Sequence, residues 1–376
     1  MAGIYLHIPF CKKRCIYCDF FSTTRSEQKT AYIRALCHEL TNRKDYLKGE
    51  PIETIYLGGG TPSQLAKEDF EAIFSHIYKV YKVTPNAEIT LEANPDDLTS
   101  EYISMLRTFP FNRISMGIQT FQDSTLKLLQ RRHTAEQAIR AFQNCRTAGF
   151  RNISIDLMYG LPGETLASWK EDLKQALALH PEHISAYHLI YEEGTTLWQL
   201  REQHKLEEAD EDLSVSLFGT LIDSLTAAGY EHYEISNFCL PGFHSRHNSS
   251  YWTEKKYLGC GPSAHSYNGT SRQWNVASLN EYIRGISNGN PTFEVEELDL
   301  YTRYNDFVIT HIRTQWGMPL PKLRKQYGEE LYKYCLRMAT PHLQQGTLEI
   351  KNDTLKLTRK GVFISDGIMS DMLWVE

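Results

Sequence analysis

Six short apolar segments, each followed by a more polar stretch, dominate the first two-thirds of the 376-residue sequence. Strands are predicted at residues 3–8, 54–57, 88–93, 113–119, 152–158 and 183–190. Several of these segments are almost continuously apolar, as expected of parallel strands covered on both faces. Helices with apolar side chains about every 3.6 residues are predicted between the strands, at residues 67–80, 134–148 and 166–179. The alternation predicts an α/β fold built on a partial or closed parallel barrel of six βα units.

The chain changes character after this region. A helix is clear near residues 210–228, but residues 230–275 are rich in Gly, Asn, His, Tyr and Trp and lack a regular pattern. An irregular stretch of this length indicates function. We predict that the chain consists of a barrel domain of residues 1–230, an irregular linking segment of residues 231–291 and a C-terminal domain of residues 292–376.

The C-terminal domain is predicted to be small and of the α+β class. It follows a break at Asn288-Gly289-Asn290-Pro291. Helices are expected near residues 299–314 and 327–345, and a β-hairpin near residues 346–358. Helices followed by a hairpin are typical of a winged-helix-like domain.

Charge and cysteine usage narrow the class of protein. The formal net charge of -6 argues against a nucleic-acid binder, and no apolar run is long enough to cross a bilayer. The first residues lack the basic region and the cleavage site of a signal peptide. The 8 cysteines lack the paired spacing of a disulfide framework, and three of them cluster, as in metal or redox sites of cytosolic proteins. We therefore expect a cytoplasmic protein.

Cys11, Cys15 and Cys18 form a C-x3-C-x2-C motif on the loop after the first predicted strand. Thiolates are natural ligands of iron–sulfur clusters, and three of them without an obvious fourth leave one iron of a cubane open. Zinc is the main alternative, but structural zinc sites need four ligands, and no second Cys or His pair is apparent. The basic residues between the first two cysteines would stabilise thiolates or an anionic cluster. The spacing favours a cluster and leaves zinc open.

Five motifs in chain order resemble one known family. They are Tyr5-Leu-His-Ile-Pro-Phe-Cys11, Gly58-Gly-Gly-Thr-Pro62, Glu92-Ala-Asn-Pro95, Gly117-Ile-Gln-Thr-Phe121 and Asp156-Leu-Met-Tyr-Gly-Leu-Pro162. The cysteine motif, with an aromatic residue before its last cysteine, is similar to the signature of radical S-adenosylmethionine (SAM) enzymes. Nearly the whole chain resembles the oxygen-independent coproporphyrinogen III oxidase family. The resemblance implies a [4Fe-4S] cluster on the three cysteines, SAM at its open iron, and a partial (βα)6 radical-SAM barrel with the family's C-terminal domain.

The resemblance also implies which residues bind SAM. Glycines after the second strand let the backbone approach a ligand closely, and the family places this edge against the methionyl amino group. Glu92 ends a buried strand, where a carboxylate is costly unless paired, and the resemblance assigns it to the ribose. Arg131 can bind a carboxylate as a fork. The expected SAM-binding residues are Tyr5, Tyr17, Gly59, Gly60, Thr61, Glu92, Gln119, Arg131 and Asp156.

Two departures from the oxidase pattern favour a sister branch of heme chaperones. The oxidase has a further cysteine two residues after the third, where this chain has Phe20. The stretch from His247 to Trp252 is similar to an H-N-x-x-Y-W motif of the chaperone branch. Imidazole is a common axial ligand of heme iron, and aromatic rings pack on porphyrin faces. We expect His247 to bind heme, and His265 is a second candidate ligand. The alternative is a purely structural role, in which His247 is a loop histidine and two aromatic residues anchor the loop.

Three hypotheses follow. The chain is a heme-binding chaperone on a radical SAM scaffold, an oxidase that decarboxylates coproporphyrinogen III in porphyrin biosynthesis, or a zinc-stabilised interaction module. The first is favoured. It implies a [4Fe-4S] cluster, SAM and heme as bound groups. It also implies a heme-acceptor protein, in solution or at a membrane, and an electron donor such as flavodoxin or ferredoxin, with no nucleic-acid partner.

Overall fold

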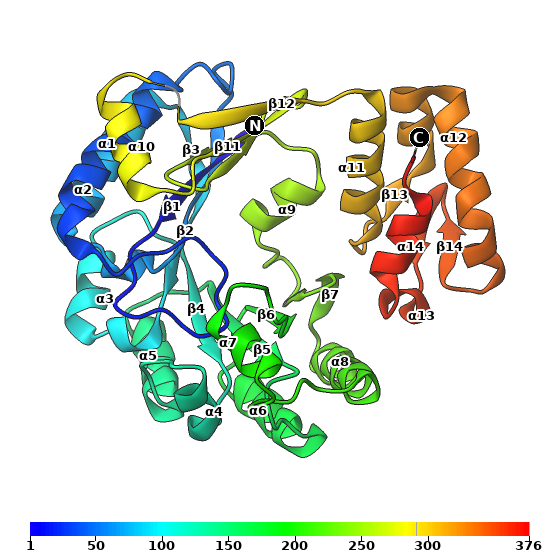
Figure 1. Cartoon of the computed structure of the whole chain (residues 1–376), viewed down its shortest axis with the longest axis horizontal. Helices are drawn as coiled ribbons and strands as arrows, with labels where there is room; N and C mark the ends of the chain where they lie inside the picture. Colours follow the sequence, from blue (N-terminus) through cyan, green and yellow to red (C-terminus); the bar gives the residue numbers. More distant parts are fainter. Residues whose placement is uncertain (291, 376) are drawn as a thin grey trace.

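The computed structural model describes residues 1–290 and 292–375 (Figure 1). The main sheet has twelve strands in the order β12-β11-β10-β9-β1-β2-β3-β4-β5-β6-β8-β7. Its six central strands are parallel, and each pairs with the next along the chain. They are β1 (Ala2–Ile8), β2 (Ile52–Gly59), β3 (Val83–Ala93), β4 (Arg113–Gln119), β5 (Ile153–Tyr159) and β6 (His183–His188). The predicted parallel core is confirmed.

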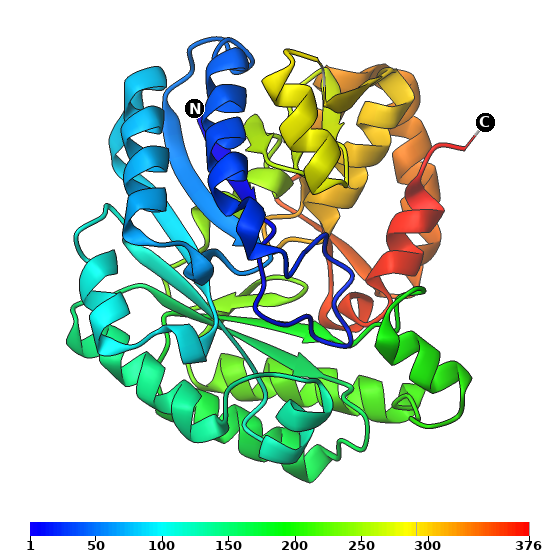
Figure 2. The ribbon, with the colours of Figure 1, turned by 60° about the vertical axis from the view of Figure 1, so that its left-hand side comes forward.

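Helices cover the outer face of these strands, as Figure 2 shows from the blue to the green part of the chain. They are α1 (Lys29–Asn42), α2 (Lys67–Val80), α3 (Ser100–Leu106), α4 (Asp123–Leu128), α5 (Ala135–Thr147), α6 (Leu166–Ala178), α7 (Thr196–Glu202) and α8 (Glu211–Ala227). Thr134 and Thr165 fix the starts of α5 and α6, because their side chains accept hydrogen bonds from the N–H groups of Gln137 and Ser168. None of the described helices is long and apolar enough to cross a membrane.

The prediction of an irregular segment at residues 231–291 is wrong for residues 231–290, the part that the structure describes. This part contains β7 (Glu231–Glu234), β8 (Asn237–Cys239), α9 (Arg246–Trp252), β9 (Tyr257–Cys260), β10 (His265–Tyr267), β11 (Ser271–Asn275) and α10 (Leu279–Ser287). With β12 (Phe293–Glu297), these strands extend the sheet at both edges. Strands of three to five residues are too short to show an alternating apolar pattern, so they could not be recognised from the sequence.

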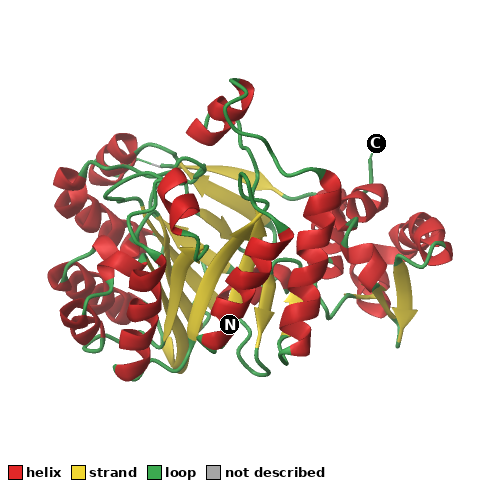
Figure 3. Cartoon of the chain, turned by 90° about the horizontal axis from the view of Figure 1, so that it is seen from below, coloured by secondary structure: helices red, strands yellow, loops and turns green. Residues whose placement is uncertain are grey.

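The barrel is partial, because its two outer central strands pair with added strands instead of each other. β9 runs parallel to β1, and β8 runs antiparallel to β6. In Figure 3 the strands form a curved layer with helices outside it and the C-terminal domain beyond one edge. The concave face therefore encloses a lumen that the loops after the strands must cover.

The C-terminal domain packs beyond α9 and has a hydrophobic core of its own (Figure 1). It consists of α11 (Leu300–Ile312), β13 (Met318–Pro319), α12 (Leu320–Gln344), β14 (Leu348–Lys351), β15 (Thr354–Leu357), α13 (Arg359–Val362) and α14 (Ser365–Met372). β14 and β15 form the predicted antiparallel hairpin, and β13 adds a third strand. The predicted small α+β domain is confirmed, with α12 starting before residue 327 and kinked at Gly328, where φ is 83°.

Candidate functional site

Cys11, Cys15 and Cys18 lie on the loop after β1 and line a single pocket of about 480 Å³ in the barrel lumen. All three thiols are partly exposed. Thr61 Oγ1 donates a hydrogen bond to Cys11 Sγ over 3.3 Å, and Arg131 Nη1 donates to Cys15 Sγ over 3.5 Å. Burial raises the pKa of Cys11, and it raises the pKa of Cys18 to about 11. A bound metal cluster would have to supply the free energy needed to deprotonate these buried thiols, as a metal ion does when it deprotonates a coordinating thiol.

Gly59, the last residue of β2, and Gly60 let the backbone pass close to the end of β1, where the cysteine loop begins. Gly59 has φ of +100°, and a Cβ there would lie 2.5 Å from the His7 ring. A Cβ at Gly60 would lie 2.7 Å from the carbonyl oxygen of Ile8. Any larger side chain at either position would displace the strand end that carries the cysteine loop.

Glu92 lies at the end of β3 and faces the lumen pocket. Its Oε1 accepts a hydrogen bond from the Tyr56 hydroxyl over 2.7 Å, and its Oε2 accepts one from the N–H of Gly59 over 3.1 Å. Burial raises the pKa of Glu92 to about 7. Each oxygen keeps a further acceptor position, so the carboxylate can still receive two hydroxyl groups from a ligand.

Two neighbouring strands supply the next polar groups. Gln119 ends β4 with φ of 73°, where the register with β5 shifts between Gly117 and Gln119. A bulge of this kind re-aims a side chain, and here it brings Gln119 to the lumen pocket. Asp156 lies beside it and accepts a hydrogen bond from Ser115 Oγ over 3.3 Å; burial raises its pKa to about 6.

Arg131 connects the cysteine loop to the strand ends. Its Nη2 donates to the carbonyl oxygen of Gly117 over 2.5 Å and to Asn94 Oδ1 over 2.9 Å. Its Nε is buried without a hydrogen-bond partner among the described residues. An unpaired buried donor next to the thiols fits a ligand carboxylate at this point.

The lumen pocket therefore fits a [4Fe-4S] cluster together with SAM. Three thiols from one loop leave one coordination position of a cubane open. Acceptors at Glu92 and Asp156 suit hydroxyl groups, and the Arg131 guanidinium suits a carboxylate. The pocket also contains His188, but its Nε2 is hydrogen-bonded with Ser214 Oγ at 3.0 Å, so it offers no free fourth ligand for zinc.

Comparisons with known proteins agree with this geometry. Residues 5–176 match the radical SAM superfamily, and residues 298–364 match the HemN C-terminal domain. The heme chaperone HemW of Bacillus subtilis is 32% identical over 376 residues, which cover 99% of each chain. The chain belongs to the HemW family. HemW of Escherichia coli is 36% identical over 265 residues, which cover 70% of this chain and 69% of the other.

The fold of this HemW family member is also that of a solved oxidase. Coproporphyrinogen III oxidase (HemN) from Escherichia coli, described as a radical SAM enzyme, superposes with a TM-score of 0.87. The match covers 99% of this chain and 89% of the oxidase, with 23% sequence identity. The likeness shows the shared fold of the barrel and C-terminal domain.

Most of the expected SAM-binding residues meet in the lumen pocket, but Tyr5 does not. The residues found there are Tyr17, Gly59, Gly60, Thr61, Glu92, Gln119, Arg131 and Asp156. Tyr5 is in register with Tyr56 of the pocket wall and faces the same side of the sheet, but it is not part of the lining, and its hydroxyl is 3.2 Å from His7 Nδ1. Tyr5 lies within β1, whereas Cys11 is on the loop after it, so a motif that contains both need not bring both to the pocket.

His247 lies inside the protein, in α9, and is only 1% exposed. Its Nδ1 is 2.8 Å from Thr54 Oγ1, and its Nε2 is 2.9 Å from the Tyr251 hydroxyl. Burial lowers the pKa of His247 to about 3. Both ring nitrogens have hydrogen-bond partners, so the neutral imidazole is not open to an iron in this conformation. The second candidate ligand, His265, lies on β10, is exposed, and stacks on Trp274.

Several pocket residues were not predicted. Asn94, Ser115, Ser185, Tyr187 and Asn248 also line the lumen pocket. Ser185 and Tyr187 are two residues apart on β6 and so face the same side of the sheet. The two-residue spacing of strand side chains could have predicted this from the sequence. Asn248 belongs to the H-N-x-x-Y-W motif, and no sequence signal shows that it reaches the lumen while its neighbours do not.

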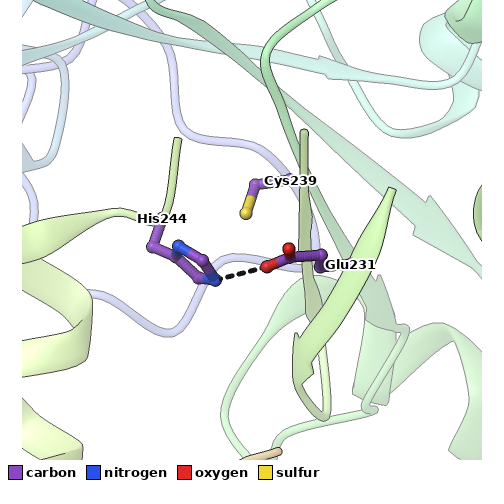
Figure 4. A group of neighbouring side chains, drawn as sticks. All are labelled: Glu231, Cys239 and His244. Carbon is purple, nitrogen blue, oxygen red and sulfur yellow. Dashed lines mark ion pairs between the residues drawn. The ribbon is translucent and has the colours of Figure 1, made fainter. Parts of the chain in front are cut away.

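A second group of possible metal ligands lies at the sheet edge (Figure 4). Glu231, Cys239 and His244 have ligand atoms within 4.8 Å of one another. His244 Nε2 is 2.9 Å from Glu231 Oε2. Burial raises the pKa of Cys239 to about 12, so its thiol remains protonated. The arrangement is a His–Glu contact beside a neutral thiol, separate from the lumen pocket.

Proposed function

We propose that this chain is a heme-binding chaperone on a radical SAM scaffold, which passes heme to an acceptor protein. The observation that carries the proposal is the position of α9, the helix of the H-N-x-x-Y-W motif. Its Asn248 reaches the lumen pocket, whereas Tyr251 and Trp252 line a second cavity. The relatives that match over the full chain are named heme chaperones.

In this proposal Cys11, Cys15 and Cys18 hold the [4Fe-4S] cluster. When bound, the cluster and SAM supply one-electron chemistry that the side chains cannot perform. The chain positions these groups: Thr61 and Arg131 contact two of the sulfur atoms. Hydrogen bonds to ligand sulfur atoms and the charge nearby tune such a centre.

The remaining residues of the lumen pocket orient SAM. Glu92 accepts hydrogen bonds from the ribose hydroxyls, with its own position fixed by Tyr56 and Gly59. Arg131 donates to the methionyl carboxylate through its unpaired Nε. Gln119 and Asp156 bind the rest of the nucleoside, and the burial of Asp156 makes its protonation sensitive to pH near 6.

Partner binding is expected at the rim of the lumen pocket. Lys13 and Arg14 line the pocket beside the thiols, and Phe20 is 62% exposed there. A basic rim suits an acidic electron donor of the flavodoxin or ferredoxin type. The heme acceptor is proposed to be a protein in solution or at a membrane, and the site of action is proposed to be the cytoplasm.

The second candidate is the oxidase function, which the shared fold favours. Phe20 stands where the oxidase pattern has a cysteine, and this counts against it. An anaerobic assay of the reconstituted protein with coproporphyrinogen III and SAM, run beside a heme titration, separates the two. The chaperone proposal expects heme binding and no decarboxylation. Conversion of coproporphyrinogen III, or failure to bind heme, would overturn it.

A further inference from the structure

In the proposed function the lumen pocket holds both the cluster and SAM. Small-molecule sites range over about 300–1,000 Å³, and this pocket has about 480 Å³. Heme, as a cargo bound at the same time, needs another place. Of the residues of the H-N-x-x-Y-W motif, only Asn248 lines the lumen pocket.

A second cavity of about 380 Å³ is lined by residues of α9 and of the C-terminal domain. Figure 1 shows α9 between the sheet and the C-terminal domain. We call this second cavity the interdomain cavity. Its barrel side comes from α9 and from the edge strands that follow it, and its far side comes from α11 and α12. Both parts of the chain must therefore be in place for the cavity to exist.

Aromatic rings form much of the wall of the interdomain cavity. Tyr251 and Trp252 of the motif are joined by Tyr257 from β9 and by Phe307 and Tyr327 from the C-terminal domain. Trp252 has the Arg313 guanidinium 4.3 Å from its ring centroid, and its Nε1 is buried without a described hydrogen-bond partner. Flat apolar walls from two domains suit a planar aromatic ligand.

Two arginines add positive charge to this wall. Arg272 contacts Asp306 over 3.0 Å and Glu296 over 3.4 Å. Arg303 lines the cavity, donates from its Nε to the carbonyl oxygen of Asp299 over 3.2 Å, and has no described carboxylate partner. Of the cavity's two acidic side chains, Asp306 is already paired with Arg272, and Glu254 is paired with Lys322. Guanidinium groups carry five donors, so both arginines can still bind carboxylates of a ligand.

Tyrosine hydroxyls are the axial heme ligands that this cavity could offer, since its described lining contains no histidine, cysteine or methionine. Tyr251 is hydrogen-bonded with His247, and Tyr327 donates to the carbonyl oxygen of Arg303 over 3.1 Å. Tyr267 donates to the carbonyl oxygen of Gly269 over 3.5 Å. The Tyr257 hydroxyl makes no hydrogen bond with a described residue. Burial raises the pKa of Tyr257 to about 12, so bound ferric iron would have to displace the phenol proton, as a metal does where it deprotonates a ligand. Tyrosinate is an established axial ligand of heme iron.

We propose that heme binds in the interdomain cavity, with Tyr257 as its iron ligand and with Arg272 and Arg303 at its propionates. The inference rests on the proposed function. His247 is then a positioning residue, which holds Tyr251 in the cavity wall from behind. Its ring also stacks on Tyr56, whose hydroxyl donates to Glu92 in the lumen pocket. One chain of contacts thus joins the two sites.

The test is the spectrum of ferric heme bound to the full-length protein. Wild type should show the phenolate modes of a tyrosinate ligand by resonance Raman, and Tyr257→Phe should lose them. Tyr301→Phe, on α11 but outside the cavity lining, is the matched control and should keep them. His247→Ala should lower heme occupancy while the phenolate modes remain in the bound fraction.

A second probe addresses the propionates. Wild type should prefer heme to heme dimethyl ester, and Arg303→Gln should reduce that preference about tenfold or more, as expected for a charge-assisted hydrogen bond. An imidazole-ligated spectrum in wild type, or phenolate modes that persist in Tyr257→Phe, would overturn the inference and leave the proposed function standing. If wild type binds no heme at all, both fail.

Discussion

Replacing Glu92 with glutamine should weaken SAM binding and, at the same time, stabilise the SAM-free protein at alkaline pH. Both effects come from one buried carboxylate at the end of β3. Glutamine has nearly the same shape, so packing is preserved. The charge and one of the two acceptor oxygens are lost.

The stability effect follows from the pKa of Glu92. Burial raises it to about 7 in the folded protein, from an ordinary value of 4.5. The folded state therefore holds this proton more tightly than the unfolded state does. The proton on Glu92 therefore stabilises the folded state at pH values below the pKa of the unfolded state. This stabilisation is lost as the pH rises through the pKa of the folded state. A shift of this size corresponds to about 3 kcal/mol at pH values above both pKa values. Glu92→Gln should unfold at higher urea than wild type at about pH 8.5.

The binding effect follows from the hydrogen bonds. The Gly59 N–H can only donate, so the glutamine oxygen must face it and the amide nitrogen must face Tyr56. A ribose hydroxyl then loses its acceptor, which costs about 1–3 kcal/mol, or about 5- to 150-fold in the dissociation constant. Calorimetric titration of the cluster-reconstituted protein with SAM measures this loss.

Glu88→Gln is the matched control for this experiment. Glu88 lies on the same strand but accepts hydrogen bonds from the N–H groups of Arg246 and His247, outside the lumen pocket. Its replacement should leave SAM affinity unchanged. Equal SAM affinity of wild type and Glu92→Gln would refute the assigned contact, and a variant less stable than wild type at alkaline pH would refute the burial argument.

Three further predictions concern the same pocket. Replacing any of the three motif cysteines with serine should abolish the visible absorbance of the reconstituted cluster, whereas Cys335→Ser, in the core of the C-terminal domain, should retain it; retention in all four variants would contradict the assignment. Gly59→Ala should destabilise the fold, because its Cβ would lie 2.5 Å from the His7 ring at a φ of +100°; an unchanged urea midpoint would contradict this. Arg131→Lys should weaken SAM binding at least about tenfold, since lysine cannot replace the contacts to Gly117 and Cys15 together with a carboxylate; wild-type affinity by calorimetry would exclude the role.

The parallel core and the cysteine loop could be predicted because their signals are local. The central strands are six to eleven residues long and each contains a short apolar segment, and the cysteine spacing lies within one loop. The edge strands could not be predicted in this way. β8 and β10 have three residues each. β8 pairs with the distant strand β6, whereas β10 pairs with its neighbours β9 and β11, and this pairing determines their conformation.

The environment of His247 could also be predicted only in part from the sequence. Ser245 caps α9 by accepting a hydrogen bond from the Asn248 N–H, and this start can be inferred locally. The burial of His247 depends on Thr54, which is 193 residues away. The same is true of Tyr257 and Arg303, which come from different domains and meet only in the folded chain.

The most direct test of the account is to ask whether heme and SAM bind together. Cluster-reconstituted wild type is saturated with SAM and then titrated with heme under anaerobic conditions, with both ligands quantified after removal of the unbound fraction. Two separate sites predict one heme per chain, with SAM and the cluster retained. Displacement of SAM by heme, or no stoichiometric heme binding, would contradict the account.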